Sequence, residues 1–314
     1  MNFKMDVEAG LNATPKTLPS KYFYDTAGDA LFVEIMKMPE YYLTDAEMEI
    51  FTDQTAAIIE ALDLQADIFF ELIELGAGDG FKTKKLLNKL TEASYAFSYI
   101  PVDISQNALT KLCAALVSEI PTLKVQPQQG DYFEILKTLK NTHHKKVVLF
   151  LGSSIGNMLD DVAADFIYKL GANLKAGDKL LLGVDLIKAQ EIVLPAYNDA
   201  TGITSAFNLN LLTRINNELQ GNFDISQFKH KPAYTEEEGI AKSYLESTTS
   251  QDVYIEALSK TYHFNRGETI HTEISRKYND SIISKIIEHT DFTVCAVLND
   301  SKDYFGDYCL HRNG

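Results

Sequence analysis

Basic residues and cysteines are both scarce in this sequence, and each shortage excludes a class of function. The chain has 29 lysines and arginines against 44 aspartates and glutamates, which gives a formal net charge of −15 at pH 7. Nucleic-acid binding requires a basic surface, so we expect no nucleic-acid partner and favour a small-molecule substrate. The three cysteines are odd in number and widely spaced, which excludes a disulfide framework and a zinc motif.

Long apolar runs are also missing. No stretch reaches the 18 apolar residues that would predict a membrane-spanning helix, and the first ten residues, MNFKMDVEAG, contain no long apolar run. The seven histidines show no spacing such as H-E-x-x-H, so we expect no metal site. We interpret the chain as a soluble, reduced, cytoplasmic protein without a membrane partner, and we expect a monomer. Its 314 residues are enough for about two domains with sizeable cores.

A glycine-rich stretch at residues 69–83, FFELIELGAGDGFKT, is the most informative part of the sequence. An apolar run ends in Glu74, and Gly76, Gly78 and Gly80 follow before a polar segment. This order predicts a strand, a turn and a helix N-terminus, where a ligand can approach the backbone closely. Phenylalanine occupies the place of the last glycine in the dinucleotide fingerprint G-x-G-x-x-G. The Glu-x-Gly-x-Gly-x-Gly form resembles instead the first motif of class I methyltransferases that use S-adenosylmethionine; a turn without a ligand is the alternative.

From about residue 66 onward, strand-like and helix-like segments alternate, which predicts a parallel sheet with helices on both faces. The expected strands span residues 68–75, 97–103, 122–126, 146–152 and 179–186, with helices at 105–118 and 160–175. Ligands of such sheets bind beyond the carboxyl ends of the strands. At those ends, Asp103 can accept hydrogen bonds from a ribose, and Asp131 with Tyr132 can meet an adenine. Each aspartate has the alternative role of capping a helix.

The segments outside this alternation predict a second domain. Residues 1–20 are polar, contain two prolines and are expected to form a loose arm, and residues 187–278 are interpreted as an inserted substrate domain. The elements expected here and in the remaining chain are a helix at 207–219, a strand-like segment at 252–264, a helix at 280–289 and strands at 292–298 and 307–312. The last two strands predict a closing antiparallel hairpin.

A cluster of tyrosines surrounds a predicted helix break at Pro39. Its members are Tyr22, Tyr24, Tyr41 and Tyr42. Such tyrosines are either packing residues or part of a lid over a ligand. Thr44 followed by Glu47 predicts a capping box at the start of the next helix.

Seven stretches spread over nearly the whole chain resemble the histidine-specific α-N-methyltransferases of ergothioneine biosynthesis. They are KYFYD at 21–25, PEYYLT at 39–44, FLGSSIGN at 150–157, LLLGVDL at 180–186, AYND at 196–199, TSAFN at 204–208 and HTEISRKY at 271–278. The resemblance implies an α/β fold, with a Rossmann-like class I methyltransferase sheet and a second, inserted α+β substrate domain. It assigns residues 52–187 and 277–314 to the methyltransferase domain and residues 1–51 and 188–276 to the substrate domain.

The family trimethylates the α-amine of free L-histidine to hercynine, with S-adenosylmethionine as cofactor. The resemblance implies that the cofactor is bound by Tyr41, Gly76, Gly78, Lys82, Asp103, Asp131, Tyr132 and Gly152. It implies that the amino acid is bound by Tyr24, Asn157, Tyr197, Ser243, Glu273 and Ser275. Of these, Tyr24, Asn157 and Tyr197 are the expected catalytic residues at the amine. Glu273 and Ser275 would hold the imidazole.

This chain departs from the family pattern at two places. The first motif reads GAGDGFKT where relatives tend to have a serine-rich turn, although the glycines and the lysine are kept. Ser243 falls where a methionine can line the imidazole side, and the smaller side chain widens the pocket. Two alternatives are therefore an α-N-methyltransferase of another aromatic amino acid, such as a tryptophan derivative, and a non-catalytic protein that binds S-adenosylmethionine. The presence of Asn157 and Tyr197 disfavours the second.

Overall fold

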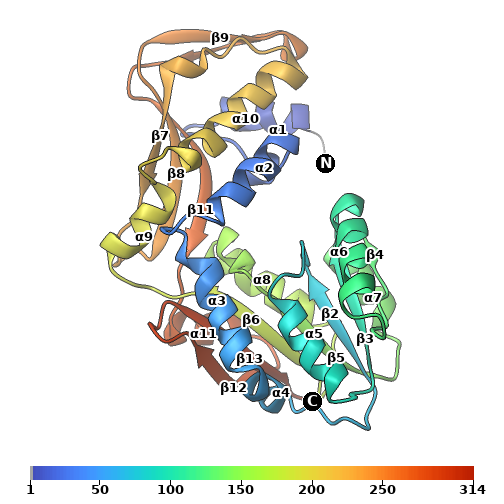
Figure 1. The fold of residues 1–314 in the computed structure, drawn as a ribbon. Helices are drawn as coiled ribbons and strands as arrows, with labels where there is room; N and C mark the ends of the chain where they lie inside the picture. The colour runs from blue at the N-terminus through green and yellow to red at the C-terminus, as the bar shows by residue number, and fades with distance from the viewer. Residues whose placement is uncertain (1–2) are drawn as a thin grey trace. The chain divides into compact units, whose positions relative to one another are not determined.

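The computed structural model describes residues 3–314, which form two compact units (Figure 1). The first unit contains the chain up to Tyr42 together with Lys188–Arg276. The second contains Leu43–Ile187 together with Lys277–Gly314. Among residues 3–314, no helix combines the length and the apolar character needed to cross a membrane.

A seven-stranded sheet forms the centre of the second unit, in the order β12-β13-β6-β5-β2-β3-β4. The strands are β2 (Phe70–Leu75), β3 (Phe97–Asp103), β4 (Gln128–Gln129), β5 (Lys145–Phe150), β6 (Lys179–Asp185), β12 (Phe292–Asn299) and β13 (Phe305–Arg312). Strands β2 to β6 are parallel, whereas β13 runs antiparallel between β6 and β12. The predicted parallel sheet and its closing hairpin are confirmed.

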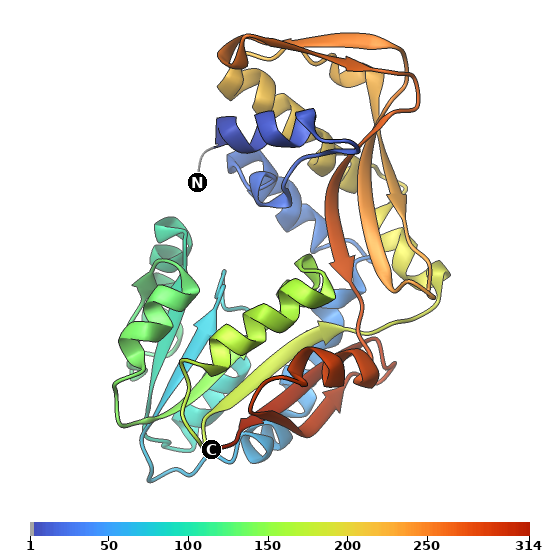
Figure 2. The same cartoon turned by 180° about the vertical axis from the view of Figure 1, so that it is seen from behind.

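Helices cover both faces of this sheet. They are α3 (Tyr42–Asp53), α4 (Thr55–Ala61), α5 (Thr83–Glu92), α6 (Gln106–Glu119), α7 (Tyr132–Leu139), α8 (Asp160–Gly171) and α11 (Asp280–Ile287), with the short η2 (Ser154–Asn157). Leu72 of β2 packs with α3, α4, α5 and α6, which include the helices in front of the sheet in Figure 1. The next residue, Ile73, packs with α7, α8 and α11, and Figure 2 shows α8 and α11 from this opposite face. This two-sided burial explains why these strands are apolar along their whole length.

The first unit combines a mixed sheet with helices. Its sheet has the order β1-β11-β8-β7, and β9 and β10 form a separate hairpin. The elements are α1 (Phe3–Asn12), β1 (Lys16–Thr17), η1 (Ser20–Tyr22), α2 (Thr26–Ile35), α9 (Gln190–Tyr197), α10 (Ile203–Leu219), η3 (Ile225–Gln227), β7 (Phe228–Ala233), β8 (Ile240–Ser247), β9 (Gln251–Ile255), η4 (Glu256–Leu258), β10 (Lys260–Phe264) and β11 (Thr269–Arg276). Buried and partly buried residues alternate along β8, as expected for a strand with one face in the core.

Two predictions for the N-terminal region are wrong. Residues 1–2 lie outside the described residues, but from residue 3 onward the chain does not form a loose arm, because Val7 and Leu11 lie four apart on one face of α1 and are buried in the core of the first unit. The boundary between the two units also lies after Tyr42, whereas the sequence predicted it after residue 51. The reason is that α3 packs through Ile50 and Phe51 into the core of the second unit.

Two further local predictions are corrected by long-range packing. Residues 122–126 do not form a strand; Val125 makes only an isolated bridge to Tyr99, and the short β4 follows. The capping box is also not formed, since α3 begins at Tyr42 and Thr44 lies inside it. Glu47 is instead buried and reaches the end of the central sheet, as described below.

Candidate active site

The turn that follows β2 exposes its backbone to a ligand. Gly76, Gly78 and Gly80 have positive φ angles of 71°, 54° and 64°, which favour glycine. A Cβ on Gly78 would meet no atom within 4 Å, whereas a Cβ on Gly76 would lie 2.7 Å from the Tyr132 hydroxyl. Helix α5 begins just beyond, at Thr83, and its first N–H groups add donors at this end of the sheet.

Asp103 ends β3 beside this glycine turn. Its Oδ1 accepts a 2.8 Å hydrogen bond from the Ser105 N–H, and its Oδ2 accepts one of 3.4 Å from the Gly78 N–H. A carboxylate has lone pairs for about four hydrogen bonds, so Asp103 can accept further bonds from the two hydroxyls of a ribose.

Asp131 and Tyr132 come next along the same edge of the sheet. Asp131 caps α7, because its Oδ1 accepts hydrogen bonds from the Phe133 N–H at 2.9 Å and the Glu134 N–H at 3.4 Å. The capping role is therefore realised, and it uses one of the two carboxylate oxygens. Burial, with Asp103 and Asp131 nearby, raises the pKa of Tyr132 to about 12, so its phenol is neutral.

Glu47, which the sequence analysis assigned to a capping box, contacts both Lys82 and Gly152. The Lys82 ammonium forms an ion pair with the fully buried Glu47 of α3. The two oxygens of Glu47 also accept the Gly152 N–H, at 2.9 and 3.1 Å. Gly152 has a φ of +69°, and a Cβ there would lie 3.6 Å from Lys82 Nζ. One carboxylate thus joins the start of α5 to the end of β5.

A second carboxyl group, Asp307 of β13, lies beside Glu47 and was not found from the sequence. A Cβ on Gly183 of β6 would overlap Glu47 Oε1 and lie 2.9 Å from Asp307 Oδ1. Asp307 is fully buried, and neither of its oxygens has a hydrogen-bond partner within residues 3–314. Burial and the Glu47 charge raise the pKa of the Asp307 carboxyl group.

Glu74, the carboxylate at the end of β2, faces the interior of the second unit. It accepts a 2.6 Å hydrogen bond from Thr83 Oγ1 and another from the Tyr99 hydroxyl. Burial raises the pKa of Glu74 to about 7, although these two hydrogen bonds oppose the shift. Glu74 is therefore engaged inside the unit, by Thr83 at the start of α5 and by Tyr99 of β3. Asp103 is the strand-end carboxylate that remains open to a ligand.

The first unit brings four of the predicted substrate residues together. Ser243 of β8 and Glu273 of β11 are direct cross-strand neighbours, and Ser243 Oγ lies 3.5 Å from Glu273 Oε2. Partial burial, followed by the charges of Glu273 and Asp29 and the nearby Tyr197, raises the pKa of the Tyr24 phenol. Tyr24 is thus within electrostatic range of Glu273 and Tyr197, and Ser243 is next to Glu273; we call these four residues the polar cluster.

Ser275 lies two residues after Glu273 on β11, so both side chains point to the same face of the strand. Tyr197 ends α9 and is only 8% exposed, packed with Val193 and Tyr234. The following loop is held by Asp199, whose carboxylate accepts the Ile203 and Thr204 N–H groups at the start of α10.

Two predicted residues lie outside these groups. Asn157 is exposed and ends η2 in the second unit, after the left-handed Gly152 and Ser153. Tyr41 belongs to the first unit, where its ring meets Phe32 edge-on at 6.3 Å. Asn157 and Tyr41 therefore belong to the opposite unit from the residues with which the sequence analysis grouped them.

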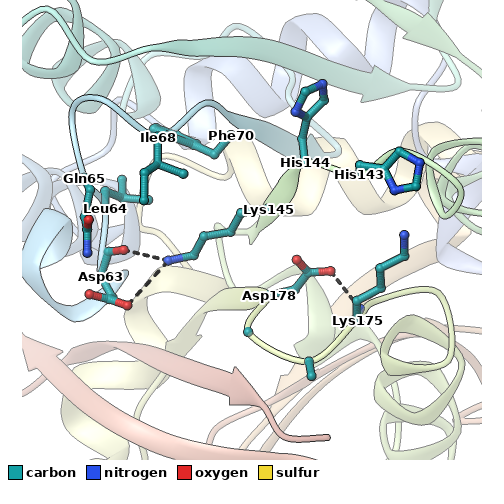
Figure 3. Close-up of a pocket in the computed structure, with 12 residues that line it drawn as sticks. Asp63, Leu64, Gln65, Ile68, Phe70, His143, His144, Lys145, Lys175 and Asp178 are labelled. Carbon is teal, nitrogen blue, oxygen red and sulfur yellow. Dashed lines mark hydrogen bonds and ion pairs between the residues drawn. The ribbon is translucent and has the colours of Figure 1, made fainter.

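A pocket of about 410 Å³ lies at the opposite, amino end of strands β2 and β5 (Figure 3). Its cationic side chains are already engaged: Lys145 Nζ donates to the Asp63 carbonyl at 2.6 Å, and Lys175 Nζ donates to the Thr142 carbonyl at 2.8 Å. It is separate from the glycine turn. Across residues 3–314 the structure has no group of three histidine, cysteine or acidic side chains that could hold a metal ion.

The strand order and the glycine turn define a class I methyltransferase. Parallel strands β2 to β6 carry an antiparallel hairpin at one edge, and the turn with Asp103 occupies the carboxyl ends of β2 and β3. The open backbone at Gly78 and the acceptor capacity of Asp103 fit a nucleoside-containing cofactor.

Comparison with known proteins identifies the family. The profile of the histidine-specific, S-adenosylmethionine-dependent methyltransferases matches residues 3–312, so the chain belongs to this family. Histidine N-alpha-methyltransferase of Mycolicibacterium smegmatis is 37% identical over 286 residues, covering 91% of this chain and 87% of that protein. The protein of the same name from Mycobacterium tuberculosis is 36% identical over 280 residues, covering 89% and 85%. Ergothioneine biosynthesis protein 1 of Schizosaccharomyces pombe is 30% identical over 302 residues, covering 94% of this chain and 39% of that protein.

Proposed function

We propose that this enzyme transfers three methyl groups from S-adenosylmethionine to the α-amine of free L-histidine, which yields hercynine. Its membership of the histidine-specific family supports the reaction. The observation that supports the choice of substrate is the polar cluster, in which Ser243 lies 3.5 Å from Glu273 and the Glu273 charge acts on the Tyr24 phenol. We propose that the first unit supplies most of the amino-acid residues and the second unit most of the cofactor residues; Tyr41 and Asn157 are the exceptions.

In the second unit, we assign the cofactor to the edge of the sheet that carries the glycine turn. Asp103 would accept the ribose hydroxyls, and Asp131 with Tyr132 would contact the adenine. Gly76, Gly78, Lys82 and Gly152 would surround the methionine part, with Tyr41 beside it. When bound, S-adenosylmethionine supplies an electrophilic methyl group on its sulfonium.

The residues assigned to the amine carry no negative charge, and this suits the chemistry. Only a neutral amine has the lone pair needed for attack, and a carboxylate at this place would favour the ammonium form. Asn157 and Tyr197 hold the amine and carboxylate by neutral hydrogen bonds. The raised pKa of Tyr24 keeps its phenol neutral near the amine as well. These residues act mainly by orientation and proximity, and the amine proton leaves through water.

The imidazole is assigned to Glu273 and Ser275. The Glu273 carboxylate can accept from one ring N–H, and the Ser275 hydroxyl can donate to or accept from the other nitrogen. Ser243, at 3.5 Å from Glu273, holds that carboxylate in place. An aromatic side chain without ring nitrogens would form neither of these hydrogen bonds, so it should bind more weakly than histidine.

Calorimetry on Glu273→Ala tests this assignment. We expect histidine affinity to fall by roughly 1.5–3 kcal/mol, the value of a hydrogen bond to a charged group, while S-adenosylhomocysteine affinity stays unchanged. Glu246→Ala is the matched control, because Glu246 lies on β8 of the same sheet and pairs with Lys229 and Lys231 at the surface. Unchanged histidine affinity in Glu273→Ala would remove the imidazole assignment.

A larger aromatic amino acid, such as a tryptophan derivative, is the second candidate substrate. Ser243 favours it, because this small side chain is 1% exposed and directly opposite Glu273, where a methionine can stand in relatives. Competition between histidine and tryptophan for methylation, followed by mass spectrometry, distinguishes the two. Histidine should be the preferred acceptor in the wild-type enzyme, and Ser243→Met should increase this preference.

A further inference from the structure

Two free cysteines face each other in the closing hairpin of the second unit. Cys295 lies on β12 and Cys309 on β13, and their sulfur atoms are 3.3 Å apart. They are separated by thirteen residues in the sequence, and neither belongs to the predicted cofactor or substrate residues. The third cysteine, Cys113, lies on α6 and is partly buried.

A β-bulge in the hairpin brings the two sulfur atoms close together. Cys309 is the direct partner of Ala296, and the register between the strands shifts between Val294 and Ala296. Cys295 is thus the extra residue of a bulge, and bulges redirect side chains. Its thiol consequently turns toward Cys309, although the two residues are not register partners.

The two thiols differ in their surroundings in a way that assigns different roles. Cys295 is exposed, and Lys179 Nζ lies 3.4 Å from its sulfur. Cys309 is fully buried, with its sulfur 3.2 Å from the Ala61 carbonyl oxygen. A soluble oxidant can therefore reach Cys295, and Cys309 can react only with its neighbour.

We propose that Cys295 and Cys309 are a peroxide-sensitive pair that closes to an intramolecular disulfide. In the first step, the Cys295 sulfur attacks a hydroperoxide; an S–O bond forms, the O–O bond breaks, and water or an alcohol leaves. In the second step, the Cys309 sulfur attacks the Cys295 sulfur; the S–S bond forms, the S–O bond breaks, and water leaves with the thiol proton. Two thiols are oxidised by two electrons in total, and one peroxide is reduced.

The disulfide would lie away from the glycine turn. Strands β13, β6 and β5 separate β12 from β2 in the sheet, which corresponds to on the order of 20 Å at the usual strand spacing. It would pin the edge strand β12 to β13 and restrict the unfolded chain, so the oxidised protein should melt at a higher temperature.

Peptide mapping after peroxide treatment tests the proposal. The folded full-length protein is treated with hydrogen peroxide, free thiols are alkylated under denaturing conditions, and the peptides are analysed without reduction. Wild type and Cys113→Ser should both yield a linked peptide pair containing Cys295 and Cys309, and both should melt at a higher temperature after oxidation. Cys295→Ser should yield no linked pair, no melting shift and a fully alkylated Cys309.

Other outcomes of the same experiment would contradict the proposed disulfide. Conversion of Cys295 to a sulfinic acid with Cys309 still alkylated would overturn the proposal, and so would a link that involves Cys113 or a second molecule. An unchanged melting temperature in the linked protein would overturn the stabilising effect. Because Cys295 is exposed, Cys295→Ser should fold normally, and the test does not depend on a substitution in the core.

Discussion

Glu74 is a buried carboxyl group of the second unit, and burial changes its pKa. Glu74 has a pKa of about 7 in the folded protein against 4.5 for an ordinary glutamate, and burial is the main cause. Because the folded-state pKa is raised, the stabilising contribution is complete below pH 4.5 and is lost as the pH rises through 7. The neutral form is therefore the one that suits this interior site.

A Glu74→Gln variant tests this titration. The wild type should lose roughly 3 kcal/mol of unfolding free energy from this group between acidic and alkaline pH, whereas the variant lacks the group and should lose less. Chemical denaturation at several pH values between 4.5 and 8 measures both proteins. Identical pH dependence in the two proteins would show that Glu74 does not titrate in this range.

Asp103 provides the residue-level test of the cofactor site. Asp103→Ala should lower the affinity for S-adenosylhomocysteine by roughly 1–3 kcal/mol, because the ribose hydroxyls lose their acceptor. Asp161→Ala is the control, since Asp161 is an exposed aspartate of α8 in the same unit. Calorimetry that gives equal affinities for both variants would rule out the ribose role.

At the scale of elements, α3 is connected to the central sheet by one carboxylate. Glu47 pairs with Lys82 and accepts the Gly152 N–H, so it links α3, α5 and the end of β5. Glu47→Gln leaves Lys82 without its anion, and we expect a loss of about 1–3 kcal/mol in unfolding free energy. This is less than for a fully buried pair, because Lys82 is 21% exposed.

The exposed Asp45 on the same helix provides the control for this prediction. Asp45→Asn removes a negative charge from α3 without touching Lys82 or Gly152, and it should change stability by less than about 0.5 kcal/mol. Denaturant titration compares the two variants. If Glu47→Gln is as stable as Asp45→Asn, the ion pair does not anchor α3.

Some helices and strands could be predicted from the sequence alone, and others could not. Strands β2, β3, β5 and β6 were predicted because strands buried on both faces are apolar throughout. Helix α1 was missed because its polar composition obscures the spacing of Val7 and Leu11. Glu47 was misassigned because a Thr-x-x-Glu pattern is local, whereas its burial depends on contacts with residues far along the chain. The Cys295–Cys309 approach depends on a bulge, which the cysteine spacing does not encode.

At the scale of the whole molecule, the family motifs were the most informative part of the sequence. They pointed to Tyr24, Tyr197, Ser243 and Glu273, which come from separate segments and all belong to the first unit, with Ser243 and Glu273 in direct contact across two strands. No local pattern joins these residues, because the segment before α2, the end of α9, and strands β8 and β11 are far apart in the sequence. Asp307 escaped prediction for the same reason, since only the folded sheet places it beside Glu47.

The most direct test of the central claim is product analysis with free histidine. The purified enzyme, S-adenosylmethionine and histidine should give mono-, di- and trimethylated products in sequence, with hercynine as the end point in mass spectrometry. Histidine amide, which lacks the free carboxylate, should react poorly in a parallel assay. Absence of methylated histidine, or efficient methylation of the amide, would contradict the account.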